Sequence, residues 1–272
     1  MSNVSLLIAG HQRSGTTLLR RVCDGHPQMR LTNEFACFAD VGLPVWQARR
    51  ARRAQWRLVN GRWAFNSQFA THPRRHWYNL WFLLRYSWHL GQATRGTMTV
   101  ADVHLALQKT VGMGTAVHGD KWPQYMPLLP RLLPSEQVKV VIIYRDCRDV
   151  TSSFLEKVRT VWRTRSWASE LNTADKIAHN WVRQIANMET LLTQFGPEKV
   201  HLMQYEQFVT EPAETLAALA TWLDIAPTGF PLRQVRASSI GKYKQGLTSD
   251  ELVQVEAVAG TTMRRLGYTA ST

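Results

Sequence analysis

The sequence predicts an α/β fold of three layers, in which helices flank a central parallel sheet. Short apolar stretches of strand length alternate with longer amphipathic stretches along the 272 residues. The two clearest strand candidates, Val4–Ala9 and Val138–Tyr144, are each followed by a turn and the start of a helix. Strands that alternate with helices pair in parallel through right-handed crossovers. We therefore expect a single domain over residues 1–272.

The first half of the chain contains four of the expected elements. Val4–Ala9 is an apolar run closed by Gly10, which is typical of a buried strand. Thr16–Cys23 has the pattern of a helix, which a glycine and a proline stop shortly afterwards. Leu31–Phe35 is a second, shorter strand candidate. Ala116–Lys121 is a short run that changes from apolar to polar at Gly-Asp-Lys.

The second half alternates in the same way. Met126–Leu133 is expected to form a helix that ends at the following proline. Val138–Tyr144 is β-branched almost throughout and is the strongest strand candidate. Ala174–Phe195 is a long amphipathic helix stopped by Gly-Pro. Val200–Gln204 is then expected to be a strand and Pro212–Leu223 a helix.

The segment 41–101 differs in composition from the rest of the chain. It contains no Asp or Glu, and we expect a helical insertion of two or three helices. Its ten arginines are Arg49, Arg50, Arg52, Arg53, Arg57, Arg62, Arg74, Arg75, Arg85 and Arg95. Its six tryptophans are Trp46, Trp56, Trp63, Trp77, Trp81 and Trp88, and their helical spacing favours packing within the insertion itself. A lid over an acceptor, a peripheral membrane contact and an oligomer interface are further hypotheses for this segment.

The net charge predicts a polyanionic partner. The formal charge is +13 and the isoelectric point is about 10.2, and the basic segment supplies most of this charge. A nucleotide, an acidic glycan, a nucleic acid and an anionic membrane surface would all satisfy it. A nucleic acid is the least favoured of these, because the charge is concentrated in one segment and no known nucleic-acid motif accompanies it.

The cysteines and the first residues favour a cytoplasmic protein. Cys23, Cys37 and Cys147 are an odd number without metal-ligand spacing, which argues against a disulfide framework and a zinc site and suits a reducing compartment. The chain begins Met-Ser-Asn-Val-Ser without a basic leader, so we expect no signal peptide. The longest apolar run, Leu80–Leu90, is interrupted by charge and is too short to span a bilayer.

The segment Gly10-His-Gln-Arg-Ser-Gly-Thr-Thr17 has the pattern of an anion-binding loop. It lies between a predicted strand and a predicted helix, and its glycines allow a tight turn close to an anion. The N-terminus of the following helix offers unpaired N–H groups and the positive end of its dipole. The loop differs from a Walker A loop, because Thr16 stands where a triphosphate hydrolase needs its lysine. A nucleotide kinase or another P-loop NTPase is therefore only an alternative.

A second anion-binding pattern follows the strongest strand. Arg145-Asp-Cys-Arg-Asp-Val-Thr-Ser-Ser153 begins at the end of Val138–Tyr144. The carboxyl ends of parallel strands face one ligand crevice, so Arg145 should lie near the first loop. An arginine can grip a phosphate with its fork of donors, and Ser153 can join it from the next helix. Two such sites on one sheet edge predict a nucleotide with two separated phosphates.

These motifs carry a family resemblance. Arg13-Ser-Gly-Thr-Thr17 and Arg145-x-x-Arg-Asp-x-x-x-Ser153 resemble the 5′-phosphosulfate loop and the 3′-phosphate motif of sulfotransferases that use 3′-phosphoadenosine 5′-phosphosulfate (PAPS). The stretch from Arg13 to Glu34 resembles in particular the tyrosylprotein and the bacterial carbohydrate-type sulfotransferases. Gly119-Asp-Lys-Trp-Pro123 is similar to the Lys-x-Pro segment of this group. The order of the motifs also agrees, and only the Arg/Trp-rich insertion is unmatched.

Further along, Gln204–Phe208 is similar to the segment that places an aromatic ring beside the adenine. Ser238–Leu247 resembles the loop that closes over the donor, and Leu266-Gly-Tyr268 is a common ending of bacterial members. The sequence departs from the family where Cys147 replaces a usual proline, and where the closing loop lacks the Gly-rich pattern of the small-molecule enzymes.

The resemblance implies a P-loop-like fold, PAPS as the sulfuryl donor and the bisphosphate PAP as its product, with no metal. The donor contacts that it implies are Arg13, Ser14, Gly15, Thr16, Thr17, Arg145, Ser153, Tyr205, Ser239, Lys242 and Lys244. It also implies that Glu34 is the general base, and that Lys121 and Arg13 stabilise the charge that moves to the departing phosphate. For the acceptor hydroxyl, which can belong to an anionic molecule, we expect a carbohydrate or glycolipid first and a tyrosyl or other phenol second.

Overall fold

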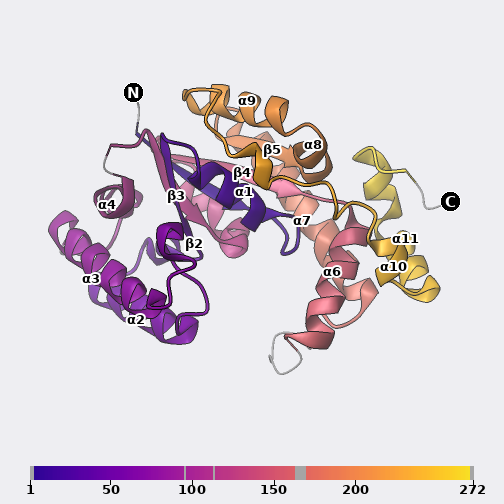
Figure 1. Cartoon of the computed structure of the whole chain (residues 1–272), viewed down its shortest axis with the longest axis horizontal. Coiled ribbons are helices and arrows are strands. Elements are labelled where there is room, and N and C mark those ends of the chain that lie inside the picture. The colour runs from indigo at the N-terminus through magenta and orange to yellow at the C-terminus, as the bar shows by residue number, and fades with distance from the viewer. Residues whose placement is uncertain (1–2, 95, 113, 163–169, 270–272) are drawn as a thin grey trace.

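Five parallel strands form the central sheet of the computed structural model, which describes residues 3–94, 96–112, 114–162 and 170–269 (Figure 1). The strands are β1 (Val4–Ala9), β2 (Met29–Asn33), β3 (Val117–Lys121), β4 (Val138–Tyr144) and β5 (Val200–Gln204). Their order across the sheet is β2-β3-β1-β4-β5, and every neighbouring pair is parallel. The predicted fold class is confirmed.

The helices alternate with the strands along the chain. In order they are α1 (Thr16–Asp24), α2 (Val45–Val59), α3 (Arg75–Ala93), α4 (Val100–Leu107), α5 (Leu129–Leu132), α6 (Cys147–Thr160), α7 (Ala174–Phe195), α8 (Tyr205–Thr210), α9 (Pro212–Leu223), α10 (Tyr243–Gly246) and α11 (Ser249–Arg265). Among the described residues, no helix combines the length and the apolar character that crossing a bilayer requires.

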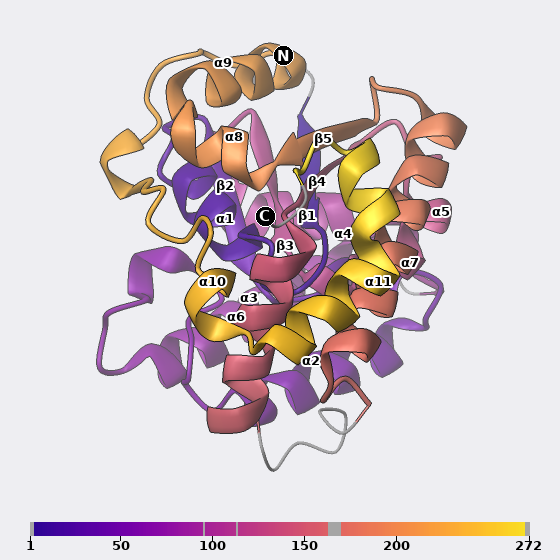
Figure 2. The same ribbon diagram turned by 90° about the vertical axis from the view of Figure 1, so that its right-hand side faces the viewer.

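Helices cover both faces of the sheet, because successive strand side chains point to opposite sides. In β1, Leu6 and Ile8 pack into one apolar cluster, and Leu7 and Ala9 pack into the other. The first cluster contains residues of α1, α8 and α9, and the second contains residues of α5, α7 and α11. Figure 2 shows these two sets of helices on either side of the strands.

The basic segment 41–101 lies at one end of the molecule. It contains α2 and α3, which pack against each other, and α4 begins at its end. Figure 1 shows α2 and α3 at the end opposite to α10 and α11. Trp56 and Trp63 pack against the core, whereas Trp46, Trp77, Trp81 and Trp88 are exposed. The expected packing of the tryptophans within the segment therefore applies to two of the six. Arg95 lies outside the described residues.

The second strand differs from the expected range. β2 is Met29–Asn33 rather than Leu31–Phe35, because Glu34 adopts a left-handed conformation with φ of 54° and ends the strand. Phe35 then turns into the apolar cluster on the other side. Because Phe35 is apolar, the sequence pattern extended the predicted strand to this residue, although Phe35 belongs to the turn that follows the strand.

Two helical regions also differ from expectation. The range Met126–Leu133 is broken into the end of a 3₁₀ helix, Pro123–Leu128, and the short α5. Its prolines lack the N–H that a continuous helix would use. In the other region, α11 is a long helix that the pattern analysis did not assign. Its start carries a capping box, in which Thr248 and Glu251 bond to each other's backbone N–H groups.

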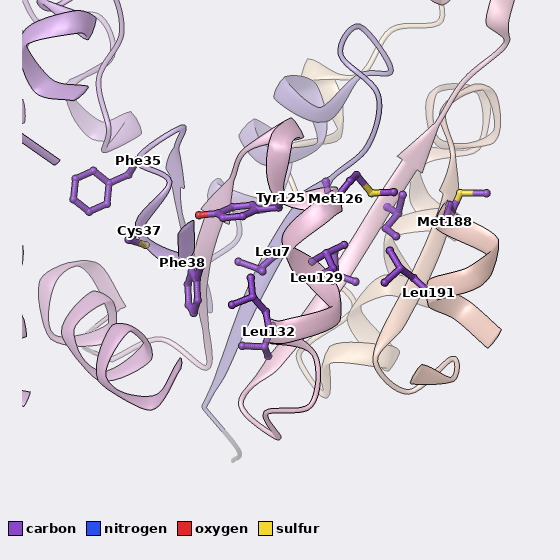
Figure 3. Packing of buried hydrophobic residues seen from close by; sticks show 14 of the residues in the cluster. Leu7, Phe35, Cys37, Phe38, Tyr125, Met126, Leu129, Leu132, Met188 and Leu191 are labelled. Atoms are coloured by element: carbon purple, nitrogen blue, oxygen red, sulfur yellow. The ribbon is translucent and has the colours of Figure 1, made fainter. Parts of the chain in front are cut away.

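The larger apolar cluster lies directly beneath the loops at the carboxyl ends of β2 and β3. Figure 3 shows Tyr125 beside Leu7, with its hydroxyl pointing toward the segment that carries Phe35 and Phe38. All four side chains are buried. The turn after β2 is therefore anchored in the core, which keeps the neighbouring Glu34 in one place.

Candidate active site

Four strand ends meet at one edge of the sheet. The loop after β1 carries Arg13, and Arg145 follows the adjacent β4. On the other side of β1, Lys121 is the last residue of β3 and Glu34 follows β2. The Glu34 N–H donates to the Lys121 carbonyl oxygen at 2.8 Å, which continues the β2–β3 pairing into the site. The predicted residues therefore converge from distant parts of the chain.

The loop after β1 forms the start of α1. Gly15 has a φ of 95°, and a side chain there would overlap the ring of Tyr205. The N–H groups of Thr16 and Thr17 belong to the first turn of α1, where no intrahelical acceptor is available. The first turn contains no acidic residue. The loop therefore presents donors and a helix dipole to an anion.

Arg13 connects this loop to the second motif. Its Nε donates to the Ser153 hydroxyl oxygen at 2.9 Å. The Ser153 oxygen accepts this bond, so its own proton is available for another acceptor. Burial lowers the pKa of Arg13; the Glu156 carboxylate opposes this shift, and the neighbouring Arg145 charge adds to it. Two guanidinium groups held this close favour an anion between them.

Arg145 is buried and held from three sides. It forms an ion pair with Asp149 at 3.1 Å, donates to the Ser239 carbonyl oxygen, and lies over the Tyr205 ring at 4.5 Å from its centroid. In the described chain its Nε–H has no acceptor. A buried donor without a partner is costly, and a ligand phosphate would satisfy it.

These groups line a cavity of about 310 Å³, here called the donor cavity. Its walls are Arg13, Gly15, Thr16, Thr17, Leu18, Arg145, Ser153, Tyr205, Gln234, Arg236 and Ser239. Eight of the eleven predicted donor contacts are among them. The cavity combines cationic groups, hydroxyls, free backbone donors and one aromatic ring, which is the set of groups that a bisphosphorylated nucleoside needs.

Three predicted donor contacts lie elsewhere. Ser14 is buried behind the loop, where it borders a small gap beside His11 and Trp181. Lys242 and Lys244 are exposed and do not line the donor cavity. The spacing of a motif does not determine which side of a loop each residue faces.

Three wall residues, Leu18, Gln234 and Arg236, were missed from the sequence, as was the supporting role of Asp149. The Asp149 carboxylate accepts from the N–H groups of Gly241 and Tyr243, at 2.9 and 3.0 Å. Together with Arg145, it fixes the segment that places Ser239 beside the cavity. Two features of the sequence could have identified two of these residues. Asp149 lies inside a matched motif, and Arg236 comes shortly before Ser239.

Glu34 and Lys121 form the central ion pair of the site. The Lys121 Nζ donates to Glu34 Oε1 at 2.5 Å. The Lys121 side chain is 1% exposed, whereas that of Glu34 is 32% exposed. Burial lowers the pKa of Lys121, and the Glu34 carboxylate opposes this shift. The carboxylate is thus the accessible partner, supported from behind by a buried ammonium.

Asp120 holds the turn that carries Glu34. Its buried carboxylate accepts from the N–H groups of Phe35 and Ala36, at 3.1 and 2.8 Å. The hydroxyls of Thr32 and Tyr125 donate to the same carboxylate, each at 2.6 Å. Burial raises the pKa of Asp120, and the four donors oppose this shift. Asp120 lies within the Gly119–Pro123 motif, but its supporting role depends on contacts that the sequence does not reveal.

A second cavity of about 400 Å³ opens over this ion pair and is here called the acceptor cavity. Its walls are Gln12, Arg13, Thr16, Thr17, Glu34, Leu58, Arg62, Trp63, Lys121, Trp122, Pro123, Gln124 and Trp162. It shares Arg13, Thr16 and Thr17 with the donor cavity. Two molecules in the two cavities would therefore meet at the first turn of α1, beside Glu34 and Lys121.

The two adjoining cavities have the form that an enzyme needs to bring an anionic donor to a second molecule. The model of the sulfotransferase family matches residues 5–228. The chain belongs to the sulfotransferase family. The predicted membership in the PAPS-dependent sulfotransferases is thereby confirmed, and it disfavours the P-loop NTPase and nucleic-acid alternatives. A search of curated protein sequences found no significant match.

Solved structures of low sequence identity share the fold. The sulfotransferase domain from the curacin biosynthetic pathway is 15% identical with a TM-score of 0.60, covering 100% of this chain and 99% of that one. The sulfotransferase domain of the Synechococcus PCC 7002 olefin synthase is 17% identical with a TM-score of 0.59, covering 95% of each chain. Mouse sulfotransferase SULT7A1, solved in complex with PAP, is 11% identical with a TM-score of 0.53, covering 97% of this chain and 86% of that one.

We predict that Asp120→Asn loosens the turn that carries Glu34. An amide cannot accept from all four donors, so at least one buried donor loses its partner. The free energy of unfolding should fall by about 1–3 kcal/mol in denaturant titrations. Hydrogen exchange should become faster at the Phe35 and Ala36 amides. The exposed carboxylate variant Asp250→Asn is the control, and equal protection of both amides in the two variants would contradict the role of Asp120.

Proposed function

We propose that this protein transfers the sulfuryl group of PAPS to an acceptor hydroxyl, with Glu34 as the general base. The single observation that carries the proposal is the junction of the two cavities at the shared residues Arg13, Thr16 and Thr17. The Glu34–Lys121 pair lies on the acceptor side of this junction. A donor and an acceptor bound on either side would be in reach of each other.

The donor cavity suits both ends of PAPS. The backbone donors and hydroxyls of Thr16 and Thr17, together with Arg13, would hold the 5′-phosphosulfate at the helix N-terminus. Arg145 and Ser153 would hold the 3′-phosphate, which would satisfy the unpaired Nε–H of Arg145. Tyr205, which also lines this cavity, would lie beside the adenine.

Glu34 would remove the acceptor proton. In the proposed reaction the acceptor oxygen bonds to sulfur, the bond from sulfur to the bridging phosphate oxygen breaks, and the hydroxyl proton moves to the Glu34 carboxylate. The product PAP leaves with the electrons of the broken bond. Lys121 and Arg13 would stabilise the negative charge that develops on the bridging oxygen. The chemistry requires no further reactant.

The acceptor cavity favours a carbohydrate or glycolipid hydroxyl. Trp63, Trp122 and Trp162 contribute aromatic surface, on which the apolar faces of sugar rings can pack. Arg62 adds a cation that would select an acidic group on the acceptor. A tyrosyl or other phenolic hydroxyl is the second candidate, because flat rings pack on the same surface. We further propose a reducing cytoplasmic setting, which the three free, buried cysteines support.

Glu34→Gln should strongly reduce turnover while leaving PAP binding intact. The amide keeps the shape of the side chain but accepts no proton at neutral pH. Turnover should fall by about 10²- to 10⁴-fold, measured with labelled PAPS and a panel of glycans, glycolipids, phenols and tyrosyl peptides. Glu214→Gln, which changes an exposed carboxylate on α9 outside both cavities, is the matched control. Turnover by Glu34→Gln at the level of this control would remove Glu34 from the mechanism.

Arg145→Ala should weaken donor binding. It removes a cation whose bonds to a phosphate are charge-assisted, so PAP affinity should fall at least about tenfold in calorimetric titrations. Arg145→Lys should recover only part of the loss, because an ammonium lacks the guanidinium fork. The exposed Arg264→Ala on α11 controls for net charge, and circular dichroism checks that each variant is folded. Unchanged PAP affinity in folded Arg145→Ala would refute the 3′-phosphate assignment.

A further inference from the structure

An exposed aromatic stripe runs along α3 at the end of the molecule opposite to α10 and α11 (Figure 1). Trp77, Trp81, Leu84 and Trp88 have exposed fractions of 65%, 53%, 58% and 61%. Their spacings of four, three and four residues place them on one face of the helix. The opposite face of α3 is buried in the core through Phe82, among others. The stripe is therefore surface that the fold does not use.

Cationic groups border the stripe on both sides. On one side, the Arg49 guanidinium of α2 donates to the Ser87 carbonyl oxygen at 2.8 Å. On the other side, Arg85 lies over the Trp81 ring at 5.4 Å and donates to the Lys109 carbonyl oxygen. The segment 41–101 contains no acidic residue that would neutralise this charge. An apolar stripe with cationic groups on both sides is complementary to a layer that has an apolar interior and an anionic surface.

The stripe continues into a shallow hollow of about 560 Å³. Its lining is Phe69, Arg74, Trp77, Tyr78 and Trp81. Phe69 and Tyr78 are stacked with their ring centroids 3.9 Å apart, which gives the hollow a rigid aromatic wall. The exposed Arg74 places a further cation at its edge. Like the stripe, the hollow therefore combines apolar side chains with a neighbouring positive charge.

We propose that α3 docks flat on an anionic lipid bilayer, with Trp77, Trp81 and Trp88 at the boundary between headgroups and acyl chains. Tryptophan prefers this boundary because its ring is apolar and its N–H remains hydrated. A helix with an aromatic face and basic flanks lies in the plane of such an interface. The flanking arginines and Lys109 attract the anionic headgroups. The protein would therefore bind at the surface of the bilayer, as peripheral membrane proteins do, without spanning it.

This docking would bring to the membrane a segment that also lines the acceptor cavity. The same basic segment contributes Leu58, Arg62 and Trp63 to the wall of that cavity. Figure 1 shows α10 and α11 at the end of the molecule opposite to α3. The docking does not depend on sulfuryl transfer, so its test measures binding alone, and its failure would leave the proposed function untouched.

The test is co-sedimentation of the full chain with vesicles. Vesicles of phosphatidylcholine with one quarter phosphatidylserine should carry the protein down, and vesicles of phosphatidylcholine alone should not. High salt should release it, because screening weakens the attraction of basic residues to headgroups. Equal binding to both kinds of vesicle, or binding to neither, would overturn the proposal.

Two sets of variants separate the apolar and the electrostatic contributions. Trp77→Ala with Trp81→Ala should weaken binding to the anionic vesicles at least about tenfold for each ring removed. Arg74→Ala with Lys109→Ala should weaken it about fivefold for each charge. The matched controls on α11 are Val253→Ala, at a position that is 67% exposed, and the exposed Arg264→Ala. Variants that bind like their controls would contradict docking through α3.

Two further measurements keep the outcome unambiguous. Every variant should retain the PAP affinity and the thermal unfolding temperature of the parent, because the changed side chains are exposed and lie outside the donor cavity. Sedimentation equilibrium without lipid tests the competing occupant, a second copy of the chain. A dimer that the tryptophan variants dissociate, combined with no vesicle binding by the parent, would assign the stripe to self-association and overturn the proposal.

Discussion

The parallel alignment of the strands is the constraint on which the site depends. Because β2, β3, β1 and β4 run in the same direction, their carboxyl ends lie along one edge of the sheet. Glu34 and Lys121 meet there across 87 residues of chain, and Arg13 and Ser153 meet across 140. An antiparallel neighbour would send its carboxyl end to the opposite edge. The order of the strands thus determines which charges become neighbours.

Buried charges keep this edge rigid. Lys121 and Asp120 are both buried, and a buried ion is tolerated only with close partners. Lys121 is paired with Glu34, and Asp120 accepts four hydrogen bonds, two of them from the backbone of the turn that carries the same glutamate. On the donor side, Asp149 joins Arg145 to the C-terminal segment. These contacts set charges in place before any ligand arrives, which is the condition for electrostatic stabilisation of a transition state.

The basic segment 41–101 contributes residues both to the acceptor cavity and to the exposed stripe of α3. Its inner residues, including Trp63, close the acceptor cavity, while α3 turns its tryptophans outward. The core side of α3 packs through Phe82, Leu83, Tyr86 and Leu90, whereas the outward tryptophans are exposed. Charge is distributed in the same way, because Arg52 is buried in an ion pair with Asp40 whereas Arg74 is exposed. Composition identified the segment as unusual, and only the fold separated its two faces.

The sequence by itself determined the alternation of strands and helices and the two anion-binding motifs. Those features are local, since apolar periodicity, glycines and prolines act on the residues around them. The tertiary structure decided the rest, because a contact depends on which distant segment folds against a residue. It turned Ser14 behind the loop, left Lys242 and Lys244 in solvent, and brought Arg236 to the donor cavity. It also made Asp120 the support of the Glu34 turn, through donors from residues that are distant in the sequence.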